Sequence, residues 1–234
     1  MDQLIFFDKK LLLLINGMHS QYWDCFFRIY TGTLVWLPLF VALAWMFFRR
    51  QNVQGIVSIF FVAMVVLVCD QVSSSICKPL FERLRPTHDD VLQYLVHTVG
   101  GYRGGSYGFV SSHAANAFGI VTFVTLVVRN RALGMALTAW ALINCYSRAY
   151  LGVHYVGDLV AGMLLGIVVG AVAYQLYLRS IMRFIVIPHH NKRTLKSGLA
   201  RSFATSPAAV AVIFWTLTVT IAICTKMIYS FAEL

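Results

Sequence analysis

Three short polar clusters interrupt an otherwise apolar chain of 234 residues. Their sequences are KPLFERLRP (78–86), VSSHA (110–114) and SRAYLGVHYVGD (147–158). Each cluster lies at or just beyond the end of an apolar segment, and together they supply cations, hydroxyl groups, two histidines and a carboxylate. These residue types suit the binding and transfer of a phosphoryl group.

Three cations in these clusters are expected to bind phosphate oxygens, namely Lys78, Arg85 and Arg148. Arginine binds phosphate oxygens in a bidentate manner, whereas lysine acts as a point charge. Ser111 offers a hydroxyl donor beside them. The backbone N–H groups of Ser112 and its successor lie where a helix is expected to begin, and a helix N-terminus attracts anions.

The two histidines suggest a division of labour. Asp158 follows His154 by four residues, so both side chains share one face if a helix begins near His154. The carboxylate would then orient the imidazole, which leaves the other ring nitrogen free to attack phosphorus. His113 would protonate the departing oxygen and later accept a proton from water. We expect neither a metal ion nor another cofactor, because no cluster of carboxylates is available to hold a metal.

Each of these residues also has an ordinary structural interpretation. Lys78 and Arg85 alone could be helix-end residues that extend their charges to water. Ser111 alone could cap a helix, and Arg148 alone could pair with Asp158. A single phosphate site accounts for all of them at once, which favours the catalytic interpretation.

Composition indicates a polytopic membrane protein. The chain is 59% hydrophobic and only 12% charged, whereas a soluble domain carries about 25% charged residues. The net charge of +10 comes mostly from short loops between apolar runs, a pattern typical of membrane topology and anionic-lipid contact rather than nucleic-acid binding. The five cysteines follow no metal-binding or disulfide pattern.

The apolar runs predict an all-α fold, a bundle of six transmembrane helices with an N-terminal interfacial amphipathic helix. Residues 1–30 form the interfacial segment, and residues 31–234 form the core with the catalytic motifs within 78–158. The predicted spans are Thr33–Phe48, Val53–Ile76, Ala114–Val128, Ala132–Tyr146, Val156–Leu178 and Ala208–Tyr229.

Basic loops predict the orientation. The segments 49–52, 129–131 and 179–202 carry basic residues and are expected to face the cytoplasm, where they contact anionic lipids. The three polar clusters then lie on the opposite face. We therefore expect a protein of the bacterial inner membrane whose site faces the periplasm or the exterior.

Four further polar residues have structural interpretations. Asp70 and Asn144 lie within or near spans and are expected to form hydrogen bonds between helices. Glu82 and Arg83 are expected to pair with each other.

The clusters resemble the three signature motifs of the type 2 phosphatidic acid phosphatase family. The first motif is Lys, six residues, then Arg-Pro; the second is Pro-Ser-Gly-His; the third is Ser-Arg, five residues, His, three residues, Asp. The matching residues are Lys78, Arg85 and Pro86 in the first, Ser111 and His113 in the second, and Ser147, Arg148, His154 and Asp158 in the third.

This resemblance implies a six-helix membrane core and metal-independent dephosphorylation through a phosphohistidine. It implies His154 as nucleophile, Asp158 as its partner and His113 as the acid. The implied phosphate-binding residues are Lys78, Arg85, Ser111, Ser112 and Arg148.

Two positions depart from the second motif. Val110 replaces its proline and Ser112 its glycine. The serine adds a side chain where the backbone is expected to approach phosphate closely, so the local geometry of this loop is expected to differ.

The sequence thus predicts an integral membrane phosphatase that acts on a lipid phosphate or diphosphate. Undecaprenyl diphosphate ranks first as substrate, lipid A is close behind, and phosphatidylglycerophosphate or phosphatidate are further candidates. Two alternatives stay open: a lipid transporter or binding protein with a vestigial site, and a phosphotransferase whose acceptor is an alcohol other than water. The sequence leaves the oligomeric state open.

Overall fold

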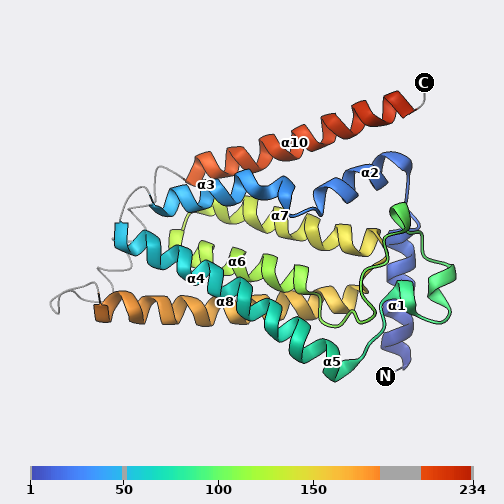
Figure 1. Ribbon diagram of the computed structural model, residues 1–234, viewed down its shortest axis with the longest axis horizontal. Coiled ribbons are helices and arrows are strands. Elements are labelled where there is room, and N and C mark those ends of the chain that lie inside the picture. Colours follow the sequence, from blue (N-terminus) through green and yellow to red (C-terminus); the bar gives the residue numbers. More distant parts are fainter. Residues whose placement is uncertain (1, 49–51, 185–206, 233–234) are drawn as a thin grey trace.

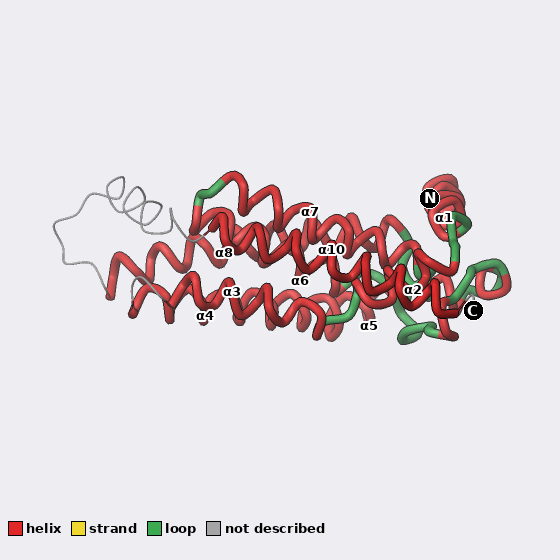
Figure 2. Tube along the Cα trace, turned by 90° about the horizontal axis from the view of Figure 1, so that it is seen from above, coloured by secondary structure: helices red, strands yellow, loops and turns green. Residues whose placement is uncertain are grey.

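The computed structural model describes residues 2–48, 52–184 and 207–232, and within these ranges the chain forms helices and loops without a strand. A bundle of helices runs along the long axis of the molecule (Figures 1 and 2). Its members are α3 (Leu37–Phe48), α4 (Asn52–Gln71), α6 (Ser112–Val128), α7 (Arg131–Tyr150), α8 (Val156–Phe184) and α10 (Pro207–Ala232).

The N-terminal segment forms two helices rather than one. Helix α1 (Asp2–Asn16) crosses one end of the bundle, and α2 (Gln21–Tyr30) follows at the same end (Figure 1). The Ser20 side chain accepts a hydrogen bond from the backbone N–H of Trp23 and so caps α2. Leu4, Phe6 and Phe7 of α1 are exposed. The location of this segment at a membrane surface stays a prediction.

The described helices support a membrane protein but not the count of six spans. The continuous helix Val53–Phe81 and the helix Val156–Arg183 are each long and apolar enough to cross a membrane. The pair Gln21–Tyr30 and Leu34–Phe48, bent by 65°, adds a third if it forms one span. Helix α6 and the stretch Ile213–Lys226 of α10 are apolar but shorter.

The second predicted span extends further than the sequence indicated. Helix α4 continues through a π-helical turn, η2 (Val72–Cys77), into the short helix α5 (Lys78–Phe81). A long loop then leads back to α6 and contains three short 3₁₀ turns. These turns are η3 (Pro86–His88), η4 (Leu92–Tyr94) and η5 (Val99–Gly101), and a further one, η1 (Leu34–Trp36), precedes α3.

Helices α6 and α8 approach each other unusually closely. Gly162, Gly166 and Gly170 recur every fourth residue of α8 and face the backbone of α6. A Cβ atom at Gly166 would lie only 2.3 Å from the carbonyl oxygen of Ala115. Small residues at this spacing let two membrane helices pack backbone to backbone. This contact fixes the start of α6 against the start of α8.

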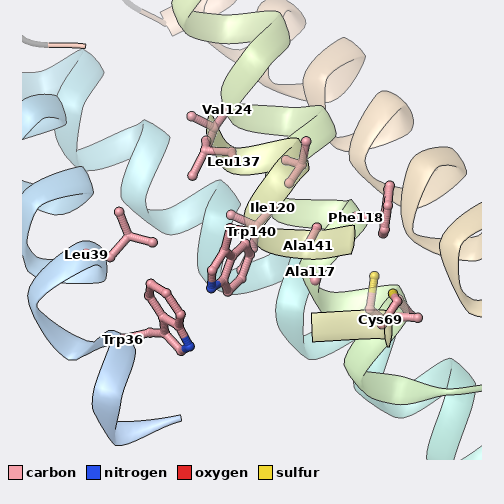
Figure 3. Packing of buried hydrophobic residues seen from close by; sticks show 14 of the residues in the cluster. Trp36, Leu39, Cys69, Ala117, Phe118, Ile120, Val124, Leu137, Trp140 and Ala141 are labelled. Carbon is pink, nitrogen blue, oxygen red and sulfur yellow. The ribbon is translucent and has the colours of Figure 1, made fainter. Parts of the chain in front are cut away.

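Aromatic and aliphatic side chains line the other side of α6. Figure 3 shows Trp36, Ile120 and Trp140 among the side chains buried between α3, α6 and α7. The rings of Trp36 and Trp140 meet edge to face with centroids 6.1 Å apart. The bundle therefore has a buried aromatic core beside the end where the polar clusters lie.

The basic stretch 179–202, which is predicted to face the cytoplasm, is described only in part. Arg179 and Arg183 belong to α8. Lys192, Arg193, Lys196 and Arg201 lie outside the described residues.

Candidate active site

The three polar clusters meet at one end of the bundle. This end brings together α5, the start of α6, the end of α7 and the start of α8, and α1 lies across it (Figure 1). Segments that are up to 80 residues apart in the sequence (78–158) thus form one site.

The predicted pair of His154 and Asp158 lies in the interior. His154 is 2% exposed and Asp158 is fully buried. The Nδ1 atom of His154 lies 3.5 Å from Oδ2 of Asp158 and has no hydrogen-bond partner among the described residues. This distance exceeds that of a good hydrogen bond, but catalytic hydrogen bonds are often long before substrate binds. The carboxylate is therefore placed to orient the ring.

The Asp158 carboxylate is itself held by two other groups. Its Oδ1 accepts a hydrogen bond from Nη1 of Arg83 at 2.7 Å, and its Oδ2 accepts one from the backbone N–H of Tyr155 at 3.2 Å. Arg83 therefore pairs with Asp158 and not with Glu82, which corrects the sequence-based prediction. The alternative pairing of Asp158 with Arg148 is not formed either.

The surroundings of His154 favour its neutral form. Burial, followed by the charges of Arg85, Arg148 and Lys78, holds its pKa well below the usual value. A neutral imidazole has a free lone pair, which a nucleophile needs. The charges of all three predicted cations thus act on this ring.

Arg85 is buried and only partly satisfied. Its Nε donates to the carbonyl oxygen of Tyr107 at 3.1 Å, whereas its buried Nη1 has no partner in the described part of the chain. Burial and the nearby Arg148 lower the pKa of this guanidinium, yet arginine stays charged in proteins. Gly104, at φ 70°, lets the loop pass over Nη1, where a Cβ atom would come within 2.5 Å.

Arg148 shows the same combination of burial and an unused donor. It is 2% exposed; Nη1 donates to the Thr31 hydroxyl at 3.2 Å and Nη2 to the Tyr102 hydroxyl at 3.3 Å. Its buried Nε has no protein acceptor within the described ranges. Buried donors without an acceptor are costly, so these guanidinium groups are suited to receive an anion.

Ser112, which replaces the glycine of the second motif, has a specific set of contacts. Its hydroxyl oxygen accepts from Nζ of Lys78 at 2.8 Å and from the Ser73 hydroxyl at 2.8 Å, and it lies 3.1 Å from the Ser74 hydroxyl. Lys78 also donates to Ser74 at 3.0 Å. The serine therefore ties the start of α6 to the π-helical turn and positions the lysine.

The remaining two predicted residues lie at the start of α6. Ser111 is fully buried and caps α6, because its hydroxyl oxygen accepts a hydrogen bond from the backbone N–H of Ala114 at 3.5 Å. Its own N–H donates to the carbonyl oxygen of Asp158 at 3.1 Å. His113 is exposed and lines a cavity, and the charges of Arg148, Arg85 and Lys78 reach its ring.

This cavity has a volume of about 520 Å³ and extends from His113 along the bundle. Its walls come from α3, α4, α6 and α7, with mostly apolar side chains such as Phe40, Val66 and Ile120. A cavity of this size and lining suits an apolar ligand that presents a polar group to His113.

Polar groups interrupt the apolar wall near His113. Asp70, Asn116 and Asn144 line the cavity. The Asn144 amide donates to the Trp140 carbonyl oxygen of its own helix at 2.9 Å, so the predicted bond to another helix is not its role. The buried Oδ1 of Asn116 accepts no hydrogen bond from a donor in the described segments.

Sequence reasoning missed several residues that the structure brings to the site. Arg83 stands two positions before Arg85, and alternate residues of an extended segment share a side, so their spacing was an available signal. Ser73 and Ser74 are hydroxyl residues inside an apolar run, which often marks function in membrane helices. Tyr102 and Thr31, the partners of Arg148, carried no such signal.

Comparisons with known proteins find sequences similar to this chain. A family model described as the PAP2 superfamily matches residues 55–182. A protein of Bacteroides thetaiotaomicron named lipid A 4'-phosphatase is 38% identical over 161 residues, which cover 68% of this chain and 72% of that protein. A Porphyromonas gingivalis protein of the same name is 34% identical over 187 residues and covers 79% of each chain.

One solved structure has a similar fold. It is a transmembrane PAP2-type phosphatidylglycerolphosphate phosphatase from Bacillus subtilis, with a TM-score of 0.57 and 21% sequence identity. The match covers 79% of this chain and 90% of that chain.

Proposed function

Because the chain belongs to the PAP2 superfamily and is a membrane lipid phosphatase, we propose that it removes a phosphate from a phosphorylated sugar lipid of the lipid A type. In this proposal His154 is the nucleophile, His113 the proton donor and Asp158 the group that orients His154. Lys78, Arg85, Ser111, Ser112 and Arg148 bind the phosphate, and no metal ion takes part.

The first step transfers the phosphoryl group to the protein. A neutral nitrogen of His154 attacks phosphorus, the bond from phosphorus to the lipid oxygen breaks, and His113 gives its proton to that oxygen. A dianionic phosphate among the surrounding cations favours the protonated form of the neighbouring His113. The Arg85 and Arg148 donors stabilise the charge on the non-bridging oxygens.

The second step restores the protein. His113, now neutral, accepts a proton from a water molecule whose oxygen attacks phosphorus. The bond between phosphorus and the His154 nitrogen breaks, and inorganic phosphate leaves. Asp158 stabilises the positive charge that the His154 ring carries while it is phosphorylated.

One observation carries the proposal. The Nη1 atom of Arg85 and the Nε atom of Arg148 are buried N–H donors without a protein acceptor in the described part of the chain. Both charges act on His154. Buried cationic donors around a neutral imidazole are what an enzyme needs to hold a phosphoryl group during in-line attack.

The polar cavity wall supports a sugar lipid over a polyprenyl substrate. Asp70, Asn116 and Asn144 line the cavity on the side of His113, where the leaving group would lie. Sugar hydroxyl and amide groups can hydrogen-bond to these side chains, whereas a prenyl chain cannot. The names of two relatives point the same way. We therefore place lipid A before undecaprenyl diphosphate, which the sequence alone ranked first.

A substrate panel tests this proposal. Purified protein in detergent with excess chelator is offered lipid A, undecaprenyl diphosphate, phosphatidylglycerophosphate and phosphatidate, and released phosphate is measured. We expect kcat/KM for lipid A to be at least about 10-fold higher than for the others, because a site that hydrogen-bonds its substrate discriminates against analogues that lack those groups.

The variant Asp70→Ala tests whether the polar part of the cavity wall sets the substrate preference. It should lose most of the preference for lipid A while its activity on phosphatidate stays within about twofold. A stronger turnover of undecaprenyl diphosphate by the wild type would reverse the substrate order. Activity that appears only after a divalent ion is added back would reject the metal-independent mechanism.

The Ser112 hydroxyl provides a second prediction. In Ser112→Gly the ammonium of Lys78 loses an acceptor at 2.8 Å, so we expect kcat/KM to fall about 10-fold, as is typical when one positioned donor is misplaced. Ser75→Ala is the matched control, because this serine lies on the same π-helical turn but is exposed and bonds to Gln71. Equal kcat/KM in both variants would mean that Ser112 is merely tolerated.

We further propose that the chain spans the membrane six times, with its site on the periplasmic or outer face of a bacterial inner membrane. The helices α6, α7 and α10 occupy the places where three of the predicted spans lie. The C-terminal ends of α6 and α8, which carry Arg129 and Arg183, lie at the end of the bundle opposite the site (Figure 1). Basic residues there would meet the anionic lipids of the cytoplasmic leaflet.

A further inference from the structure

Helix α1 reaches the candidate site through Asp8. One carboxylate oxygen of Asp8, Oδ2, pairs with Nη2 of Arg83 at 2.7 Å, and the other, Oδ1, accepts a hydrogen bond from the backbone N–H of Gly157 at 2.9 Å. The family match begins only at residue 55, so this contact comes from a part of the chain outside it.

Arg83 joins Asp8 to Asp158. Its Nη2 contacts Asp8 while its Nη1 donates to Oδ1 of Asp158 at 2.7 Å. Its guanidinium carbon also lies 4.2 Å from the ring centre of Tyr155. A planar guanidinium can bridge two carboxylates in this way, whereas an ammonium cannot do so with the same geometry.

The bridge bears on Asp158 because that carboxylate has few other supports. Asp158 is fully buried, whereas the side chains of Asp8 and Arg83 are 13% and 27% exposed. A buried carboxylate needs a paired cation to stay charged. Its remaining partner is the backbone N–H of Tyr155 on Oδ2, the same oxygen that faces His154 at 3.5 Å.

Asp8 also acts on the helix that carries Asp158. Gly157 lies in the first turn of α8, where backbone N–H groups lack partners within the helix. The carboxylate of Asp8 accepts a hydrogen bond from this N–H, and its negative charge interacts favourably with the dipole of α8. A Cβ atom at residue 157 would lie 2.7 Å from Oδ2 of Asp8, so a larger residue there would displace this carboxylate.

We propose that Asp8 is a positioning residue: the N-terminal helix completes the catalytic machinery by holding Arg83, which in turn fixes Asp158 against His154. The inference rests on the proposed function, in which Asp158 orients the nucleophile. Asp8 touches neither the substrate nor the reacting atoms, so its effect is on the rate of the chemical step and not on lipid binding.

The variant Asp8→Asn tests the charge of this contact while it keeps an oxygen acceptor for Gly157. We expect kcat to fall about 10-fold with KM unchanged within about twofold, since misplacement of a catalytic group affects the transition state more than the bound substrate. Lys9→Gln is the matched control. Lys9 ties the same helix to the loop through Asp89 at 2.7 Å but makes no contact with Arg83, and it should keep wild-type kcat.

A double-mutant cycle separates this role from general stability. If Asp8 acts through Arg83, Asp8→Asn should lower kcat by less than about twofold in an Arg83→Gln background, because the two changes then share one effect. Independent effects of the two substitutions would overturn the inference. So would equal losses of kcat in Asp8→Asn and Lys9→Gln, which would indicate only loss of helix docking. Unfolding temperatures in detergent check that all variants fold.

A binding measurement makes the test independent of the lipid that the protein turns over. Vanadate becomes five-coordinate when a nucleophile binds it, and this form resembles the transition state. Its binding therefore needs an oriented nucleophile, whereas the binding of inorganic phosphate does not need one. We expect calorimetry to show that Asp8→Asn weakens vanadate binding about 10-fold and leaves phosphate binding within about twofold. An unchanged vanadate affinity would reject the positioning role, whereas the substrate panel tests the proposed function by itself.

Discussion

Replacing His154 by glutamine is expected to lower the rate of phosphate release by at least about 1,000-fold, because the phosphoryl group then has no acceptor on the protein. Glutamine fills much of the space of the buried imidazole, which is 2% exposed, so the variant avoids the cavity that alanine would leave. Labelled substrate followed by a quench at high pH should trap phosphohistidine in the wild type and none in the variant.

His19→Gln is the matched control for this result. The His19 side chain is exposed and stacks on His97, with ring centres 4.0 Å apart, and it belongs to none of the three polar clusters. It should keep full activity and the trapped intermediate. If His154→Gln retains more than about a tenth of the wild-type rate, attack by this ring is not the mechanism.

The second large effect is expected at Arg148. Its guanidinium contacts Thr31 and Tyr102 and keeps a buried Nε donor without a protein acceptor in the described ranges. Arg148→Lys retains the charge but loses the planar set of donors. We expect kcat/KM to fall about 100-fold, the typical cost of removing one preorganised donor to a transition-state oxygen.

The control for Arg148 lies on the loop before the same helix. Arg129 precedes α7 at the end of the bundle far from the site, where Nη2 donates to the Tyr174 hydroxyl at 3.3 Å. Arg129→Lys should keep kcat/KM within about twofold of the wild type. If Arg148→Lys also keeps kcat/KM within about twofold of the wild type, Arg148 supplies charge alone.

The sequence predicted best those features that depend on spacing over a short stretch of chain. His154 lies just before α8 and Asp158 lies in its first turn, and their four-residue separation brings them together, as expected. Ser111 begins α6 because its hydroxyl group caps that helix, and this requires only local hydrogen bonding. All-helical structure likewise follows from long apolar runs, since a bilayer demands internally satisfied backbone groups.

Contacts between distant segments were beyond sequence reasoning. Its position in the sequence predicts that Arg83 pairs with its neighbour Glu82, but the loop brings Arg83 to Asp158 and Asp8, each 75 residues away. Ser112 replaces the glycine of the second motif, and its role follows from a contact that the sequence does not show. The π-helical turn places Lys78 against the hydroxyl of this serine. A single sequence contains local periodicity, whereas these pairings depend on how helices pack.

The glycines at positions 162, 166 and 170 have a consequence for the evolution of specificity. Since they hold α8 against one side of α6, the cavity lies on the other side and takes its walls from α3, α4, α6 and α7 without a contribution from α8. Asp158 lies on α8 and therefore does not border the cavity. Substitutions in the cavity walls can therefore change which lipid tail the protein accommodates, while the reacting groups keep their positions.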